Sequence, residues 1–378
     1  MGKGRLRIGV IGCGGIAQMM HLPFLQKNAD RFEITALCDL SNKVLSALAR
    51  RYHLPDTGCF TDYQLMLKQN LDAVLVTSGG DHTPQVRAAL LAGAHVFVEK
   101  PLCYTQAQAL ELGRLAQEQK LRLMVGYMKR FDPAYQRARQ LLAGLGELHY
   151  VQLNTLHPEE EGYLYFQGLF QAEDIAPETI RHLRAQEDQA ITAAVGEIPA
   201  YLRAEYTDVL LGSMVHDINV LRGLLGEPQK VLFAEHWPQG EKPGGITTTM
   251  MFSPDLRVVY TWVFLAELRD YSQEIALMSA SQRLRLQFPS PYLRHFPTSL
   301  THQYMKDGAA VEEKITVNYD EAFEQELLAF YDCVVNDREP LTGADDARAD
   351  IAVLQQILAG LHPVGLSGEA AGYMLGRN

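Results

Sequence analysis

Short apolar runs alternate with longer amphipathic stretches through the first third of the chain. The runs are rich in β-branched residues and cover 7–11, 33–38, 72–77, 95–99 and 122–125. Most of the intervals between them are long enough for a helix, which parallel neighbouring strands require. This part of the chain is therefore predicted to be an α/β domain with a doubly wound parallel sheet.

The pattern changes near residue 128. Five apolar runs then follow one another with only short turns between them, at 231–237, 246–252, 257–264, 274–279 and 283–288. Such short joins demand antiparallel pairing. A further strand is predicted near 314–318, and helices are predicted at 321–336 and 345–361.

Two domains are therefore predicted, one over 1–127 and a second, α/β domain with a mainly antiparallel sheet over 128–378. Within the second, an acidic segment at 156–205 contains three consecutive glutamates, 159–161, and a predicted helix at 177–194. This segment is either a lid or an ordinary surface excursion of the second domain. Charge runs usually mark solvated faces, which favours the excursion.

Composition and charge restrict the classes of function. The chain has 378 residues, 47% of them apolar and 21% charged, which is ordinary composition for a globular protein of two domains. A formal charge of −11 argues against binding along a nucleic-acid backbone, so small molecules are the expected ligands. The five cysteines are scattered and lack the paired spacing of zinc sites, so we predict no metal centre and a reducing compartment. No run approaches about 18 apolar residues and no leader pattern opens the sequence, which predicts a soluble, cytoplasmic protein without membrane contact.

A glycine-rich motif directly follows the first predicted strand. It has the form G-x-G-x-x-A, from Gly12 through Gly14 to Ala17, and leads into an amphipathic stretch. Gly12 permits the tight turn, Gly14 permits the close approach of a pyrophosphate, and Ala17 lets the helix pack closely on the strand. Amides at the helix start face the phosphates, and we count Gly15 and Ile16 among the cofactor-binding residues.

An acidic residue ends the second predicted strand at the distance expected for a dinucleotide site. Asp39 lies 22 positions after Ala17 and is predicted to accept hydrogen bonds from the adenosine ribose hydroxyls. A carboxylate there repels a 2′-phosphate, so the predicted cofactor is NAD. NADP stays possible because Lys43 or Arg50 could turn toward the site. The alternative for Asp39 is that it caps the following helix.

The tripeptide Glu99-Lys100-Pro101 stands where the predicted strand at 95–99 ends. Open parallel sheets bind ligands at this carboxyl edge. Oxidation of an alcohol needs a base for the hydroxyl proton, and reduction of a carbonyl needs an acid. A partly desolvated lysine can serve as either, although an isolated lysine is usually a solvated surface charge.

Several further motifs accompany that tripeptide. They are H-L-P at 21–23, T-S-G-G-D-H at 77–82, G-A-H-V-F-V-E-K-P-L at 93–102, G-Y-M-K-R-F-D-P at 126–133, and a histidine, His216, in a predicted helix that ends at Gly226. With them the chain resembles the glucose-fructose oxidoreductase, inositol dehydrogenase and MocA family (Gfo/Idh/MocA). The resemblance is close over 6–135, looser around His216 and Glu326, and weak over 156–205.

The resemblance implies a fold and an activity. Members have a Rossmann domain followed by an α/β domain whose open antiparallel sheet often forms the oligomer interface, so a homodimer or homotetramer is expected. Their active site lies in the cleft between the domains, and most of them oxidise or reduce sugars, polyols and related carbonyls. The roles implied for single residues are acid/base for Lys100, the cofactor pocket for Glu99, Thr77 and His82, a cis bond before Pro101, and substrate binding or catalysis for His216.

The helix predicted around His216 supports a role for this histidine from the residues alone. At about 100° per residue, apolar residues gather on one face, and another face is shared by Gly212, His216, Asn219 and Gly223. Small and polar residues indicate a helix face that a ligand or another part of the chain approaches closely. The alternative is a glycine-lined contact between helices, with His216 as a core histidine.

One position departs from the family pattern. Many of its polyol dehydrogenases carry an aspartate four residues before the histidine, where this chain has Gly212. Asp208 would lie about 12 Å from His216 along a helix axis and Asp217 would point roughly 100° away, so neither is a simple replacement. The sequence therefore supports Lys100 more firmly than a proton relay through His216.

The function predicted is an NAD-dependent oxidoreductase that acts on a sugar, cyclitol or sugar-derived hydroxyl or carbonyl group. Tyr127, Lys129 and Arg130 are candidate substrate contacts, although Arg130 is equally suited to hold the domain junction. Two other functions fit the same fold. One is a glycoside hydrolase that oxidises its substrate transiently with recycled NAD, and the other is a non-catalytic sensor that binds a dinucleotide.

Overall fold

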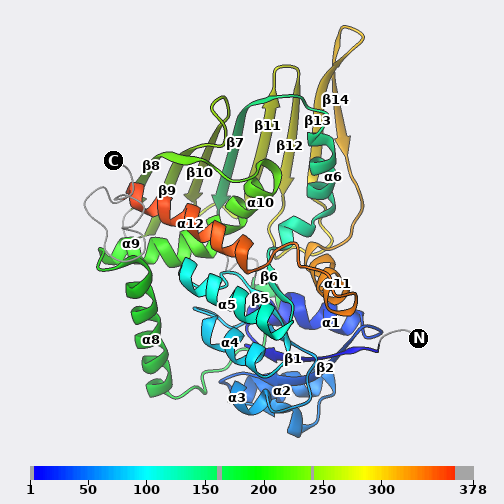
Figure 1. Ribbon diagram of the computed structural model, residues 1–378, viewed down its shortest axis with the longest axis vertical. Coiled ribbons are helices and arrows are strands. Elements are labelled where there is room, and N and C mark those ends of the chain that lie inside the picture. The colour runs from blue at the N-terminus through cyan, green and yellow to red at the C-terminus, as the bar shows by residue number, and fades with distance from the viewer. Residues whose placement is uncertain (1–3, 160–163, 240–241, 362–378) are drawn as a thin grey trace. The chain divides into compact units, whose positions relative to one another are not determined.

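The computed structural model describes residues 4–159, 164–239 and 242–361 (Figure 1). The chain divides into two compact units. The first unit comprises Met1–Tyr127, Gln167–Ala194 and Phe323–Ile351, and the second comprises Met128–Phe166, Val195–Ala322 and Ala352–Asn378. Among the described residues, no helix has both the length and the apolar character needed to cross a membrane.

The first unit is built on a six-stranded sheet in the order β3-β2-β1-β4-β5-β6, with every neighbouring pair parallel. Its strands are β1 (Leu6–Ile11), β2 (Phe32–Cys38), β3 (Cys59–Phe60), β4 (Ala73–Val76), β5 (His95–Glu99) and β6 (Leu123–Gly126). The predicted doubly wound parallel sheet is confirmed. Of these strands only β3 was not predicted, because two residues are too few for a periodic pattern.

Helices connect these strands, as parallel pairing requires. They are α1 (Leu22–Lys27), α2 (Asn42–Tyr52), α3 (Tyr63–Met66), α4 (Thr83–Leu91) and α5 (Gln106–Gln119), and a π-helical turn, η1 (Ala17–His21), precedes α1. Side chains cap the longer helices: Ser41 Oγ accepts a hydrogen bond from the Val44 amide at the start of α2, and Thr105 and Gln108 form a capping box at the start of α5.

The chain returns to the first unit twice after Tyr127. The first return includes most of α8 (Pro177–Val195), and the second includes most of α11 (Ala322–Val335) and the start of α12 (Ala344–Leu361). The ring of Phe330 on α11 packs against that of Phe97 on β5, with centroids 5.8 Å apart. Residues 167–194 belong to the first unit, so this part of the segment at 156–205 is not the excursion of the second domain that the charge pattern favoured.

The second unit contains an eight-stranded sheet in the order β14-β13-β12-β11-β7-β10-β9-β8, drawn as neighbouring arrows in Figure 1. Its strands are β7 (Leu148–His157), β8 (Lys230–Gln239), β9 (Lys242–Met251), β10 (Arg257–Phe264), β11 (Ser272–Ser279), β12 (Gln282–Phe288), β13 (Ser299–Lys306) and β14 (Ala309–Ile315). Among the described strands of this sheet, β7 and β10 alone pair in parallel, which confirms the mainly antiparallel sheet. Of the strand predicted near 314–318, only residues 314–315 lie in a strand, at the end of β14. Strand β13 was not predicted, and few of its side chains are buried.

Helices complete the second unit. The turn η3 (Met128–Phe131) leads into α6 (Pro133–Leu142), and a continuous helical run later comprises α9 (Ala200–Ala204), the π-helix η5 (Glu205–Met214) and α10 (Val215–Leu225). A rotation of about 100° per residue describes an α-helix and fails for a π-helix, which has more residues per turn. The rotation used around His216 therefore applies to α10 but not to η5, which contains Gly212. Burial does not separate the two predicted faces, because Val215 and Ile218 from the apolar face and Asn219 from the other face are all buried.

Candidate active site

The glycine turn after β1 is held against the loop after β4. Gly12 has φ +87°, and a Cβ atom added there would lie 2.5 Å from Ser78 Cα. Thr77 Oγ1 donates a hydrogen bond to the Gly12 carbonyl at 2.5 Å. Gly14 is exposed, and a Cβ atom added there would meet no atom within 4 Å. Only glycine fits position 12, whereas position 14 borders open space at the carboxyl edge of the sheet. Gly15 and Ile16 lie half-buried between Gly14 and η1.

This difference between the two glycines gives a matched pair of variants. Gly14→Ala is expected to leave the melting temperature of the cofactor-free protein unchanged and to weaken NAD binding at least tenfold, because the new methyl group stands where a pyrophosphate would approach. Gly12→Ala is expected to destabilise the protein by at least about 1–3 kcal/mol, the usual cost of backbone strain, because the new methyl group also clashes with the Ser78 backbone. Thermal melts and NAD titrations test both. Wild-type NAD affinity in Gly14→Ala would contradict the placement of the pyrophosphate at this turn.

Asp39 ties the end of β2 to the glycine turn. Its Oδ2 accepts a hydrogen bond from the Cys13 amide at 2.8 Å, and its Oδ1 accepts one from the Ser41 amide at 2.9 Å. The cap of α2 is Ser41, whose Oγ accepts from the Val44 amide at 3.0 Å. Asp39 is thus not the side-chain cap of α2. It is half-buried, and carboxylate oxygens can each accept more than one hydrogen bond, so it retains capacity for ribose hydroxyls.

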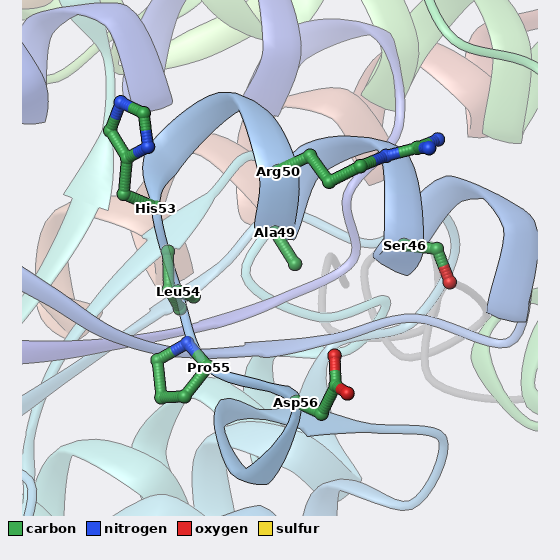
Figure 2. A pocket seen from close by; sticks show the side chains of 7 residues that line it. All are labelled: Ser46, Ala49, Arg50, His53, Leu54, Pro55 and Asp56. Carbon is green, nitrogen blue, oxygen red and sulfur yellow. The ribbon is translucent and has the colours of Figure 1, made fainter.

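Lys43 and Arg50, the two cations that could allow NADP to bind, occupy different parts of α2. Lys43 is exposed in the first turn of α2, two residues after Ser41. Arg50 lies nine residues beyond Ser41, about 13 Å at 1.5 Å per residue. Figure 2 shows Arg50 beside a surface hollow that it lines together with His53 and Asp56 near the end of α2. Arg50 is therefore not beside Asp39.

Lys100 follows β5 directly and is half-buried. Its amide donates to Glu99 Oε2 at 3.3 Å, and the Lys100-Pro101 peptide bond is cis, as the resemblance implied. His82 is buried, with Nδ1 2.7 Å from the Pro101 carbonyl oxygen and Nε2 2.6 Å from that of Ser78. It therefore fastens the loop after β5 to the loop after β4. The glycine turn, Asp39, Thr77 and Lys100 thus all follow the carboxyl ends of parallel strands.

His216 is half-buried in the first turn of α10, in the second unit. Further along the same face, Arg130 Nη1 donates to the backbone and side-chain oxygens of Asn219, both at 3.2 Å. A Cβ atom at Gly223 would overlap Tyr135 and Arg130. The close approach predicted for this face is therefore made at Asn219 and Gly223 by side chains of the same unit. This supports the packing interpretation for that part of the face.

Comparison with known proteins decides the family of the first unit. Residues 6–127 match the model of Gfo/Idh/MocA, described as an oxidoreductase family with an NAD-binding Rossmann fold. The first unit of this chain contains a Gfo/Idh/MocA Rossmann domain. The resemblance noted in the sequence is confirmed, and so is NAD as the class of cofactor.

Individual relatives extend the comparison. An inositol 2-dehydrogenase/D-chiro-inositol 3-dehydrogenase of Shouchella clausii is 36% identical over 139 residues, which are 36% of this chain and 40% of that protein. The chain thus matches well under two thirds of that relative's length. Among solved structures, an aldose-aldose oxidoreductase from Caulobacter crescentus, complexed with glycerol, has a TM-score of 0.72 at 19% identity and covers 96% of this chain and 99% of its own. A 3-ketoreductase from Actinomadura kijaniata, in complex with TDP-benzene and NADP, has a TM-score of 0.71 at 20% identity and covers 94% and 98%. At these identities the two structures show the fold alone.

The first unit also contains a buried ionisable cluster that includes Glu99, the residue before Lys100. We define the Glu326 cluster as His21, Glu99 and Glu326, which are 0%, 8% and 0% exposed. His21 Nε2 lies 2.7 Å from Glu99 Oε1. One ring nitrogen of His21 and one carboxylate oxygen from each glutamate all lie within 4.8 Å of one another. Rings of Phe97 and Phe323 flank His21, with centroid distances of 5.3 and 5.9 Å. These residues lie in or near motifs shared with the family, but nothing in the sequence indicates that they meet, because they come from three distant segments.

Burial and the nearby Glu99 carboxylate raise the pKa of Glu326 well above its ordinary value. Below about pH 4.5 Glu326 is protonated in both the folded and the unfolded chain, so its contribution to stability does not change. As the pH rises further, only the unfolded chain loses the proton, and the folded state loses stability by about 1.4 kcal/mol per pH unit until the raised pKa is reached.

Glu326→Gln should remove this pH dependence, because glutamine has nearly the same shape and no charge. The variant is expected to be at least as stable as the wild type at pH 7. Near pH 4.5 its free energy of unfolding should be lower relative to that of the wild type than it is at pH 7. Denaturant melts between pH 4.5 and 8 test this, with Glu118→Gln on the exposed face of α5 as the control. Parallel stability curves for Glu326→Gln and the wild type would rule out a protonated Glu326.

Lys129, a predicted substrate contact, takes part in a buried network of the second unit. Its Nζ lies 3.3 Å from Asp217 Oδ1 and donates to Gln273 Oε1 at 2.5 Å, and its side chain is almost fully buried. Burial lowers the pKa of Lys129, and Asp217 opposes that shift. Asp217 also accepts hydrogen bonds from Thr155, at 2.9 Å, and from Tyr260. Asp217, in the same unit, therefore balances the charge of Lys129. Tyr127, Lys129 and Arg130 are all buried, and their role in substrate binding stays a prediction.

Proposed function

We propose that this protein is an NAD-dependent oxidoreductase that transfers a hydride between nicotinamide C4 and a carbon bearing a hydroxyl or carbonyl group, in a sugar, a cyclitol or a related compound. The observation that carries the proposal is the position of Lys100, which follows β5 at the same sheet edge as the glycine turn and Asp39. The inositol dehydrogenase activity named for the Shouchella clausii relative supports the substrate class.

The residues at this edge fit a dinucleotide. Gly14 leaves open space beside the turn, Gly12 adopts a backbone angle reserved for glycine, and Asp39 presents a carboxylate at the end of β2. In the proposed complex, Gly14, Gly15 and Ile16 hold the pyrophosphate and Asp39 accepts the ribose hydroxyls. Thr77, His82 and Glu99 shape the pocket by fixing the loops after β4 and β5.

When bound, NAD supplies the acceptor or donor of the hydride. Lys100 Nζ accepts the hydroxyl proton of the substrate during oxidation and returns a proton to the carbonyl oxygen during reduction. His216 is proposed to bind the substrate or assist it, as the family resemblance implies. The proton transfer is assigned to Lys100 because of its position after β5, at the same sheet edge as the glycine turn.

A panel of inositols, aldoses and aryl glycosides tests the proposal. The purified protein with NAD is expected to accumulate NADH with at least one polyol or sugar, followed at 340 nm. Release of the aglycone without net NADH would instead support an NAD-recycling glycoside hydrolase. NAD binding with neither turnover nor exchange of label between NADH and carbonyl ligands would support a sensor.

A further inference from the structure

Residues 168–176, which we call the strap, lie between the turn at Tyr165–Gln167 and α8 and belong to the first unit. The strap is fastened at the glycine turn by Gln18. The Gln18 side chain accepts a hydrogen bond from the Phe170 amide at 2.8 Å and donates to the Phe170 carbonyl at 3.0 Å. It also donates to the Cys13 carbonyl at 2.8 Å, so one amide joins the strap to the motif.

The strap is fastened a second time at the start of α2, by Asp174. Ser41 Oγ donates to Asp174 Oδ1 at 2.5 Å, and the Lys43 amide donates to Asp174 Oδ2 at 3.0 Å. These two hydrogen bonds lower the pKa of Asp174, so its carboxylate is ionised. Ser41 therefore lies between two carboxylates, because its amide donates to Asp39 Oδ1.

The groups that hold Asp174 are those that a phosphate would use. A hydroxyl and a backbone amide at the N-terminus of an eleven-residue helix favour an anion, and the helix dipole adds to this preference. If Asp39 accepts the ribose hydroxyls, a phosphate on the 2′-oxygen would extend toward the residues that follow Asp39. The carboxylate of Asp174 already lies there and carries the same sign of charge.

We propose that Asp174 is a specificity-determining residue, whose carboxylate occupies the anion position at the start of α2 and, together with Asp39, excludes the 2′-phosphate of NADP. This inference rests on the proposed function, because it assumes that the dinucleotide lies at the glycine turn. It assigns a role to part of the segment at 156–205, where the family resemblance is weakest.

Binding of two non-redox probes tests the proposal in the full chain. Wild-type protein and Asp174→Asn are titrated with ADP-ribose and with 2′-phospho-ADP-ribose by calorimetry. Asparagine keeps the size of the side chain and removes its charge. The variant is expected to bind the phosphorylated probe at least tenfold more tightly than the wild type does, with less than a threefold change for ADP-ribose. Higher salt should reduce the difference, because screening weakens the repulsion.

Glu173→Gln is the matched control, since Glu173 is exposed, adjacent in sequence and of the same charge. Melting temperatures of both variants show whether the fold is intact, and Asp174→Ser gives a second uncharged variant if Asp174→Asn is unstable. Equal changes for the two probes, or the same preference in Glu173→Gln, would overturn the role of Asp174 while leaving the proposed function in place. Failure of the wild type to bind ADP-ribose at all would overturn both.

Discussion

Replacing Lys100 with methionine is expected to lower turnover of the sugar or polyol substrate by roughly 10²–10⁴-fold, the usual contribution of a general acid or base. Methionine retains much of the length of the lysine side chain and removes the amine that exchanges a proton with the substrate oxygen. The glycine turn, Asp39 and the loop held by His82 make their contacts without the Lys100 amine. NAD affinity is therefore expected to stay within a few-fold of the wild type.

Steady-state NADH formation and NAD titration measure the two effects separately. Lys68→Met, at an exposed lysine of the same unit, is the control for loss of a positive charge. A Lys100→Met protein that keeps most of its rate would reject Lys100 as the acid/base. A protein that loses NAD binding to the same extent as turnover would instead indicate that the lysine mainly holds the cofactor.

The largest expected effect on stability comes from Asp217. Asp217→Ala leaves the buried ammonium of Lys129 without its carboxylate, and breaking a buried ion pair on one side costs about 3–5 kcal/mol. Thr155 and Tyr260 lose a hydrogen-bond acceptor at the same time. The loss is expected in denaturant-induced unfolding monitored by circular dichroism.

A double variant separates the charge from the other effects. Lys129→Met combined with Asp217→Asn removes both charges and retains an acceptor at position 217, so it is expected to be more stable than Asp217→Ala. Asp208→Ala, at an exposed carboxylate of η5, is the control and should change stability by less than about 0.5 kcal/mol. A change below 1 kcal/mol in Asp217→Ala would show that the pair contributes little.

The parts of the candidate site that the sequence revealed are contiguous along the chain. The turn from Gly12 to Ala17 and the Glu99-Lys100-Pro101 step each place their chemistry within a few residues, next to a strand with a clear apolar pattern. Asp39 could be found because the distance from the glycine motif to the end of the next strand varies little in this fold. These signals depend on local backbone geometry, which short stretches of sequence determine.

The sequence patterns were less informative where helices and strands pack on distant partners. The predicted second domain was one continuous range, 128–378, whereas α8 and α11 pack largely with the first unit. An amphipathic pattern shows that a helix has an apolar face, but not which sheet covers that face. The rotation of an α-helix was assumed around Gly212, which lies in the π-helix η5. The order of apolar residues does not distinguish a π-helix from an α-helix.

The sequence by itself determined the α/β class, the parallel pairing of the strands in the first unit, the dinucleotide motif and the lysine at the end of a strand. Only the tertiary structure brought Glu326 to His21 and Glu99, Lys129 to Asp217, and Asp174 to the start of α2. The physical reason is the range of the forces involved. Backbone preferences and hydrophobic periodicity act between near neighbours along the chain, whereas desolvation and charge pairing depend on which groups become neighbours once the chain has folded.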